Sequence, residues 1–268
     1  MKKIIAILLS LVFMLTFASC GNNLGDDSKE ENREYIADSD IINFIQNPDN
    51  YKGKYVKISG KISSQIADGD EITLQIYTPY DDFNNDVLVD CSNGSETFSE
   101  DEYVIVEGKI EGSQKYESLL GEELTSPLIE AVSVQKVSYI DAISPTLKSV
   151  DVWQTVNPGN SPMTLEKVEF AEKETRLYFT FENHTGGEYD LYTYSCALVQ
   201  NGNQYEQQDN FDANYPELST DVIPEAKTSG VITFPAIDQN TDFMVRISGC
   251  AYSDFETNDF DFYVTVNQ

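Results

Sequence analysis

The stretch Tyr55-Val56-Lys57-Ile58-Ser59-Gly60-Lys61-Ile62 decides the fold of the first half of this chain. Apolar and polar residues alternate along it, so one face of the predicted strand is apolar and the other carries the lysines. Gly60 interrupts the strand, and a glycine inside a strand is typical of a bulge or a sharp bend. The pattern returns in Val106-Glu107-Gly108-Lys109-Ile110. Two strands bent in this way indicate a small barrel.

The neighbouring sequence supplies the other elements of that barrel. Ser39-Asp40 begins one short helix, and Asn47-Pro48 ends it because proline cannot continue a helix. Beyond residues 55–62, further strands are predicted at 72–77, 87–91, 103–111 and 128–137. Together these segments predict a five-stranded, partly open barrel over residues 38–138.

The second half of the chain is also β-rich. Its predicted strands lie at 150–153, 165–170, 175–182, 191–200, 228–234, 243–249 and 260–266. Their number and spacing favour an antiparallel sandwich over residues 148–268, after a linker at 139–147. Asn201-Gly202 predicts a tight hairpin turn within it. The fold class expected for the whole chain is therefore all-β.

Residues 47–62 resemble a known family. Asn47-Pro48-Asp49-Asn50-Tyr51-Lys52-Gly53-Lys54 is similar to the N-P-x-x-Y-x-G-K turn before the first strand of OB-fold (tRNA-anticodon-binding-like) domains of bacterial lipoproteins. In those domains V-x-G-K-I recurs in the fourth strand, as it does at 106–110 here. The resemblance covers residues 38–138 and implies a small OB-like barrel.

The second half resembles the telokin-like, immunoglobulin-like domain of unknown function that recurs in bacterial lipoproteins. Residues 181–185 are similar to its v-x-N-x-(S/T) strand end, and 198–205 to its hairpin. Residues 223–234 are similar to its l-P-G-x-x-x-G-x-v-x-F strand, with Glu225 in place of the usual glycine. The resemblance implies an Ig-like β-sandwich, and because the family has no assigned activity it implies no catalytic residues.

The first twenty residues predict an exported, lipid-anchored protein. A basic start, an apolar run over residues 4–17 and small residues before Cys20 form a secretory signal. The run is shorter than the roughly 20 residues that a membrane-spanning helix needs. Residues 17–20 resemble a lipobox, with Phe17 where leucine is usual, which implies cleavage after residue 19 and a lipid such as palmitate on Cys20. An ordinary cleaved signal or an uncleaved anchor is the alternative.

Residues 20–37 carry few apolar side chains and several carboxylates, so we expect a disordered acidic tether after the lipid. The chain as a whole holds 46 acidic against 17 basic residues, a formal charge of −29. Such a surface repels phosphate backbones, so we expect no nucleic acid partner. The expected location is the extracytoplasmic face of the cell membrane.

The second and third strands of the predicted barrel form the surface on which OB folds commonly bind oligomers. Here they carry the side chains of Thr73, Gln75, Tyr77, Leu88 and Asp90. A neutral glycan or a peptide fits such a surface better than a polyanion does. The barrel could instead serve as a packing scaffold alone.

The sequence argues against catalysis. Its single histidine, His184, lies in a turn, and no G-x-S-x-G, G-x-G-x-x-G or P-loop motif is present. A carboxylate-based hydrolase would need two acids converging in a cleft. We therefore expect no enzyme activity and no cofactor.

Acidic loops offer weak calcium candidates, because calcium prefers several oxygen ligands on a flexible loop. The residues concerned are Asp68, Asp70, Asp81, Asp82 and Asp86, together with the loop at 254–259. None has the EF-hand spacing, and acidic loops are common in a chain of this charge, so no metal is expected.

Of the remaining cysteines, Cys91 is in phase with the apolar residues of its strand and is expected to be buried. Export permits a disulfide between Cys196 and Cys250. Cys250, however, falls out of phase with the inward residues Val245 and Ile247, so this pairing is left open.

These observations predict a membrane-anchored extracytoplasmic lipoprotein that acts as a non-catalytic binding module for an unknown peptide, glycan or protein partner. The alternative is a structural or envelope-assembly lipoprotein with no small ligand. A calcium-binding surface protein and a carboxylate-based hydrolase are the lesser alternatives.

Overall fold

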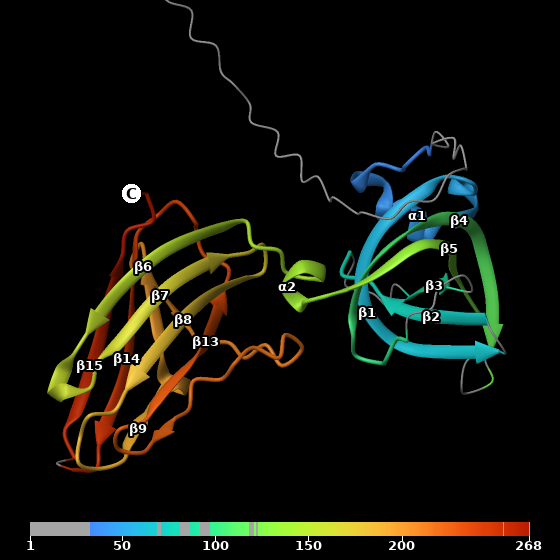
Figure 1. Cartoon of the computed structure of the whole chain (residues 1–268). Coiled ribbons are helices and arrows are strands. Elements are labelled where there is room, and N and C mark those ends of the chain that lie inside the picture. The colour runs from blue at the N-terminus through green and yellow to red at the C-terminus, as the bar shows by residue number, and fades with distance from the viewer. Residues whose placement is uncertain are drawn as a thin grey trace, which may run out of the picture. The chain divides into compact units, whose positions relative to one another are not determined.

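The computed structural model describes residues 33–68, 71–80, 86–91, 97–117, 121, 123–253 and 255–267. The predicted leader, Cys20 and most of the tether lie outside the described residues. Residues 34–268 belong to one compact unit. Strands dominate it, in one closed barrel and two further sheets, and this confirms the all-β prediction (Figure 1). The division at residues 139–147 into two domains stays a prediction.

The barrel has the five strands predicted, in the order β1-β2-β3-β5-β4, but it is closed rather than partly open, because β4 pairs with β1. Only β3 and β5 pair in parallel, while the other neighbours are antiparallel. The strands are β1 (Tyr55–Asp68), β2 (Glu71–Tyr77), β3 (Asp86–Asp90), β4 (Tyr103–Glu117) and β5 (Glu123–Val137). Barrel closure removes the free strand edges that an open sheet would expose.

Gly60 is where β1 changes partner. The first half of β1, from Tyr55 to Lys61, pairs with β4. The second half, from Lys61 to Asp68, pairs with β2. A Cβ atom on Gly60 would lie 2.3 Å from the carbonyl oxygen of Tyr77, closer than any side chain tolerates. Gly108 on β4 is equally confined, since its Cβ would lie 2.5 Å from the carbonyl oxygen of Glu130. Both glycines are thus required by close backbone approach.

The barrel interior is an apolar core to which every strand contributes. Helix α1 (Ile41–Gln46) adds Ile41 and Phe44, and Cys91 is buried there as predicted. The other buried members are Val56, Ile58, Ile62, Leu74, Ile76, Val87, Val89, Phe98, Val104, Val106, Ile110 and Ile129. None of the helices in the described part of the chain is long and apolar enough to cross a membrane.

Helix α2 (Tyr139–Ala142) precedes the two sheets of the sandwich. One sheet has the order β13-β8-β7-β6, and the other has β11-β10-β14-β9-β12 with β15 on β14 (Figure 1). Their strands are β6 (Lys148–Val156), β7 (Met163–Phe170), β8 (Glu174–Glu182), β9 (Tyr189–Leu191), β10 (Ala197–Gln200), β11 (Asn203–Glu206), β12 (Asp221–Val222), β13 (Lys227–Pro235), β14 (Phe243–Ala251) and β15 (Thr257–Val264).

One predicted strand is divided in the structure. Residues 191–200 separate into β9 and β10 because a 3-10 turn at Thr193–Ser195 lies between them. The predicted hairpin is confirmed: Gln200 pairs with Asn203, and Asn201 and Gly202 have φ values of 52° and 77°. Two positive φ values in a two-residue loop suit the twist of antiparallel strands.

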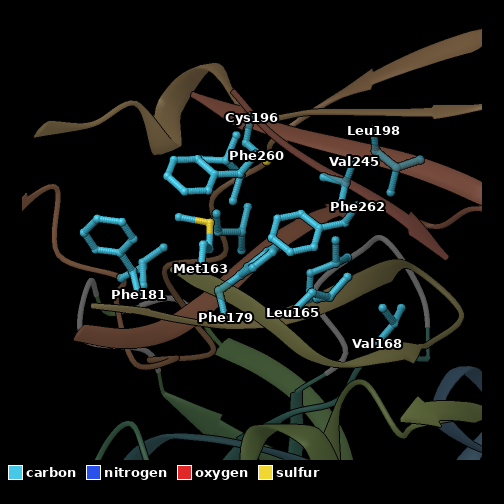
Figure 2. Close-up of a cluster of buried hydrophobic side chains, with 14 of the residues drawn as sticks. Met163, Leu165, Val168, Phe179, Phe181, Cys196, Leu198, Val245, Phe260 and Phe262 are labelled. Carbon is cyan, nitrogen blue, oxygen red and sulfur yellow. The ribbon is translucent and has the colours of Figure 1, made fainter. Parts of the chain in front are cut away.

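Aromatic side chains from the two sheets meet in the sandwich core (Figure 2). Phe179 of β8 contacts Phe262 of β15 with ring centroids 5.5 Å apart, and Phe181 contacts Phe260 at 5.9 Å. All four side chains are buried. The alternation that predicted strand 175–182 therefore places Phe179 and Phe181 inside, as expected.

Asn183, from the v-x-N-x-(S/T) resemblance, has a structural role. It is fully buried at the end of β8, and its Nδ2 donates to the carbonyl oxygens of Gly187 and Val222. Its Oδ1 accepts from the backbone N–H and the hydroxyl of Thr185. The motif thus fastens the β8–β9 loop to β12.

The disulfide left open for Cys196 and Cys250 is not formed, and both thiols are free and buried. Cys196 belongs to the core and lies beside Phe260 in Figure 2. In the β10–β14 ladder Ala197 pairs with Arg246, so Cys196 lies beside Ile247. Ile247 is three residues from Cys250. At about 3.3 Å per residue the two cysteines lie roughly 10 Å apart along the strands, beyond the reach of a disulfide.

Candidate functional site

The outer face of β1, β2 and β3 is the candidate site. Leu74 and Ile76 of β2 are fully buried in the barrel, so the alternating residues Thr73, Gln75 and Tyr77 face outward. Across the β2–β3 ladder, Thr73 pairs with Asp90, Gln75 with Leu88, and Tyr77 with Asp86. This is the surface named from the sequence, and the structure brings those residues together as a row.

Gln75 is the centre of a small polar cluster on this face. Its Nε2 donates to Asp86 Oδ2 at 2.7 Å and lies 3.4 Å from the hydroxyl oxygen of Tyr116. Its Oε1 accepts from the hydroxyl of Ser64 on β1 at 3.0 Å. Four side chains from β1, β2, β3 and β4 therefore meet here, and we call them the Gln75 cluster.

Asp86 is the member of the cluster with unmet bonding capacity. Its Oδ1 is buried, and no hydrogen-bond partner for it exists among the described residues. Burial raises the pKa of Asp86 above its ordinary value, although the hydrogen bond from Gln75 opposes this effect. A buried acceptor without a donor costs free energy, on the order of 1–3 kcal/mol. A ligand that supplies a donor to Oδ1 would recover that cost.

Apolar groups border the cluster. Tyr77 is 46 % exposed and Ile66, opposite Thr73 on β1, is 52 % exposed. Leu88 differs from the prediction, because it is only 3 % exposed and offers no surface to a ligand. Leu88 has a strand neighbour on each side, Gln75 of β2 and Leu128 of β5.

Sequence reasoning missed Ser64 and Tyr116. Both lie far from Gln75 along the chain, and the predicted strands ended at residues 62 and 111. In the structure β1 continues to Asp68 and β4 to Glu117, so each strand carries one more polar residue to the cluster. Alternation of polar and apolar residues breaks down at Ser63 and at Gly112, where the ladders shift register, and this hid the continuation.

Only some of the candidate calcium ligands lie among the residues that the structure describes. The side chain of Asp68, and the whole of Asp70, Asp81 and Asp82, lie outside the described residues. Asp86 bonds to the Gln75 amide. In the part of the chain that the structure describes, no three His, Cys, Asp or Glu side chains gather as a metal site would require.

His184 lies in the loop after β8, exposed as expected. Its Nε2 is 3.2 Å from a Glu182 oxygen, and its Nδ1 is 3.6 Å from a Glu225 oxygen. These are surface contacts between an imidazole and two flexible carboxylates, and contacts of this kind contribute little.

A second polar cluster surrounds Arg176 of β8, on the face of the sheet opposite the core residues Leu177 and Phe179. The guanidinium is fully buried, and it donates to Glu169 at 3.2 Å and to Glu174 at 2.8 Å. Further donors and acceptors complete the group, namely Ser144, Thr146, Tyr178, Asn210 and Tyr215. We call this set the Arg176 network.

The two carboxylates of the network are held in their charged form. Burial by itself would raise the pKa of Glu169, but hydrogen bonds from Lys167 and Tyr178 and the nearby Arg176 keep it below the usual value. Burial would also raise the pKa of Glu174. Hydrogen bonds from Tyr215, Asn210 and Arg176, among others, lower it below the usual value instead. Because every member is bonded within the protein, the network serves the fold rather than a ligand.

A cavity of about 530 Å³ borders the network, and its lining includes Tyr139, Leu147, Glu174 and Asn210. Polar groups of this lining already bond to one another, since Asn210 donates both to the Glu174 carboxylate and to the hydroxyl oxygen of Tyr139. The Gln75 cluster, with its unmet acceptor, is therefore the stronger candidate.

No protein-family model and no curated protein matches this chain. Two solved structures align with it. One is a functionally unknown protein from Listeria monocytogenes EGD-e, 8 % identical, covering 49 % of this chain and 94 % of that one with a TM-score of 0.39. The other is a conserved domain protein from Bacillus anthracis, 8 % identical, covering 78 % of this chain and 92 % of that one with a TM-score of 0.37.

Proposed function

We propose that this chain is a lipid-anchored extracytoplasmic lipoprotein whose barrel binds an uncharged glycan at the Gln75 cluster, without catalysis. The leader sequence with Cys20 supports the proposed lipid anchor and extracytoplasmic location. The observation that carries the binding role is Oδ1 of Asp86 on β3, which is buried and has no hydrogen-bond partner among the described residues. A carboxylate oxygen only accepts, so the ligand must bring a hydrogen-bond donor.

The charge of the protein narrows the ligand class. With 46 acidic and 17 basic residues, the chain repels nucleic acids and other polyanions. Within the cluster itself, the groups available to a ligand are one carboxylate, one amide and two hydroxyls. These groups suit a neutral ligand rich in hydroxyls, since each can exchange a hydrogen bond with an O–H group.

The exposed ring of Tyr77 supports a glycan rather than an extended peptide. Sugars present apolar C–H faces together with hydroxyl edges, and an aromatic ring beside hydrogen-bonding side chains serves both. Gln75 and Tyr77 alternate on the same face of β2, with Asp86 opposite Tyr77 on β3. The ring and the acceptor thus lie side by side. A peptide partner is the competing possibility that the binding test addresses.

Binding is tested with the full-length protein in a polyoxyethylene detergent, on arrays of neutral oligosaccharides and of neutral peptides. Asp86→Asn should weaken glycan binding at least tenfold, because the amide that replaces the carboxylate presents a donor where the ligand needs an acceptor. Tyr77→Ala should weaken it similarly. Tyr263→Ala, which removes an exposed tyrosine from the sandwich, is the matched control and should change affinity less than twofold.

Asp86→Asn should also leave the melting temperature unchanged or higher, because it removes a partly buried charge. Loss of binding without loss of stability would separate a ligand role from a structural one. If no oligosaccharide binds, if only peptides bind, or if Asp86→Asn binds as the wild type does, the glycan proposal fails.

The membrane anchor is tested separately by Cys20→Ser. A serine cannot take the thioether-linked lipid, so the protein should move from the membrane fraction to the medium or the periplasm. Fractionation and immunoblotting measure the change, and replacement of the neighbouring Ser19 by alanine, which keeps a small residue before the cysteine, is the control. A Cys20→Ser protein that stays with the membrane after its signal is cleaved would contradict the anchor.

A further inference from the structure

Two pairs of aromatic residues lie on either side of the paired residues of β9 and β14, outside the sandwich core. Tyr252 and Phe255 follow β14, and their rings stack with centroids 5.9 Å apart and an interplanar angle of 27°. Tyr192 and Tyr194 follow β9, with ring centroids 6.1 Å apart. Phe255 is 75 % exposed and Tyr194 is 74 % exposed. Large exposed aromatic groups of this kind mark interaction sites more often than isolated ones do.

Strand pairing joins these aromatics into one surface. β9 pairs with β14, so that Asp190 lies opposite Cys250. The backbone N–H of Tyr192 donates to the Ser248 carbonyl oxygen, and that of Tyr252 to the Glu188 carbonyl oxygen. Cys250 is absent from the sandwich core, and Tyr252 lies two residues further on, so both point to the outer side of the sheet.

Three carboxylates belong to the same surface. Asp190 of β9 and Asp221 of β12 are directly opposite in the ladder, and Glu188 is exposed just before β9. Asp190 is the largest cause of a raised pKa at Tyr252, followed by burial, Asp221 and Glu188. In the described chain none of the three acids forms an ion pair with lysine or arginine.

The combination indicates the chemistry of a partner. An aromatic ring attracts a cation through the negative charge of its face, and carboxylates add to that attraction. Anionic lipid headgroups and a second copy of this chain are both disfavoured, because each would bring more negative charge to an unneutralised acidic surface. Tyrosine-rich surfaces with complementary charge are typical of protein interfaces.

We infer that the surface formed by Tyr192, Tyr194, Tyr252 and Phe255 with Glu188, Asp190 and Asp221 docks a basic segment of a partner protein. Lysine or arginine side chains of that segment lie against the rings, with their charged ends beside the carboxylates. This inference concerns the sandwich and is independent of the glycan proposed for the barrel.

The test measures binding of a fluorescein-labelled peptide of six Lys-Gly repeats to the full-length protein by fluorescence anisotropy at 150 mM salt. A Glu-Gly peptide of equal length and vesicles of anionic phospholipid are the comparison ligands. Tyr252→Ala with Phe255→Ala should weaken binding of the lysine peptide about tenfold, and Asp190→Asn with Asp221→Asn should do so as well.

Matched variants separate this surface from the general negative charge of the protein. Tyr263→Ala removes an aromatic ring elsewhere on the same sheet. Asp151→Asn with Glu172→Gln removes two exposed acids, one from β6 of the other sheet and one from the turn between β7 and β8. Each should change affinity less than twofold. The inference is overturned if the wild type does not bind the lysine peptide, if the controls weaken binding as much as the surface variants do, or if the Glu-Gly peptide or the vesicles bind equally well.

Discussion

Replacing Arg176 by methionine is expected to lower the free energy of unfolding by about 3–5 kcal/mol. Methionine fills much of the same space, but it leaves the carboxylates of Glu169 and Glu174 buried without their shared cation. An uncompensated buried charge is far costlier than a lost surface contact. For a chain of this size the melting temperature should fall by roughly 6–20 °C. Urea unfolding followed by circular dichroism at pH 7 measures the change.

The same substitution at Arg246 is the control. Arg246 also forms two hydrogen bonds to a carboxylate, both 2.6 Å long, to Asp261. Its side chain, however, is 48 % exposed. Water therefore screens this pair, and Arg246→Met should cost no more than about 1 kcal/mol. Equal losses for the two variants would contradict the account of the Arg176 network.

The pH dependence of stability that these carboxylates cause should be smaller in the variant than in the wild type. In the wild type the pKa values of Glu169 and Glu174 are lowered by folding, so they contribute stability above the ordinary glutamate pKa. That contribution is lost as the pH falls through the lowered values. In Arg176→Met each carboxylate loses one of the groups that lower its pKa and keeps the others, so the variant has less of this stability to lose. The stability difference between the two proteins should therefore shrink between pH 7 and pH 4.

Replacing Gly60 by alanine is expected to destabilise the barrel by about 1–3 kcal/mol or more. The new Cβ would collide with the backbone carbonyl of Tyr77, which is held in the β1–β2 ladder and cannot move aside as a flexible side chain could. The β1 strand would have to leave the β2 strand at the point where it changes partner. The measurement is urea unfolding followed by circular dichroism, in which the midpoint urea concentration of the variant should be lower than that of the wild type.

Gly186→Ala is the matched control for Gly60→Ala. A Cβ on Gly186 would meet no atom within 4 Å. Its alanine variant should be neutral or slightly more stable, because alanine reduces the freedom of the unfolded chain. If Gly60→Ala unfolds at the same urea concentration as Gly186→Ala, the close approach at Gly60 has no energetic consequence and the account of the bend is wrong.

Much of the fold could be predicted because its signals are local. A period of two places Val56 and Ile58 inside a strand whatever the partner, and Asn201-Gly202 forms its turn from the φ preferences of those two residues. Gly60 indicated a bend before the partner strand was known. The predicted signal at Cys20 is equally local, since it rests on contiguous sequence alone.

The candidate site was foreseen only in part. Gln75 and Tyr77 follow from alternation along one strand, and their strand is the one on which OB folds bind. Ser64 and Tyr116 do not follow, because both lie beyond register shifts that interrupt the pattern. Leu88 was expected to be available, and only the structure shows that its side chain is covered.

By itself, the sequence determined the all-β class, the bends at Gly60 and Gly108, the hairpin and the predicted export signal, because each depends on neighbouring residues alone. Tertiary structure decided the rest. The unpartnered oxygen of Asp86 and the burial of Arg176 depend on strands separated by many residues. Barrel closure and sheet register bring those strands together, and hydrogen bonding and desolvation depend on the neighbours that result.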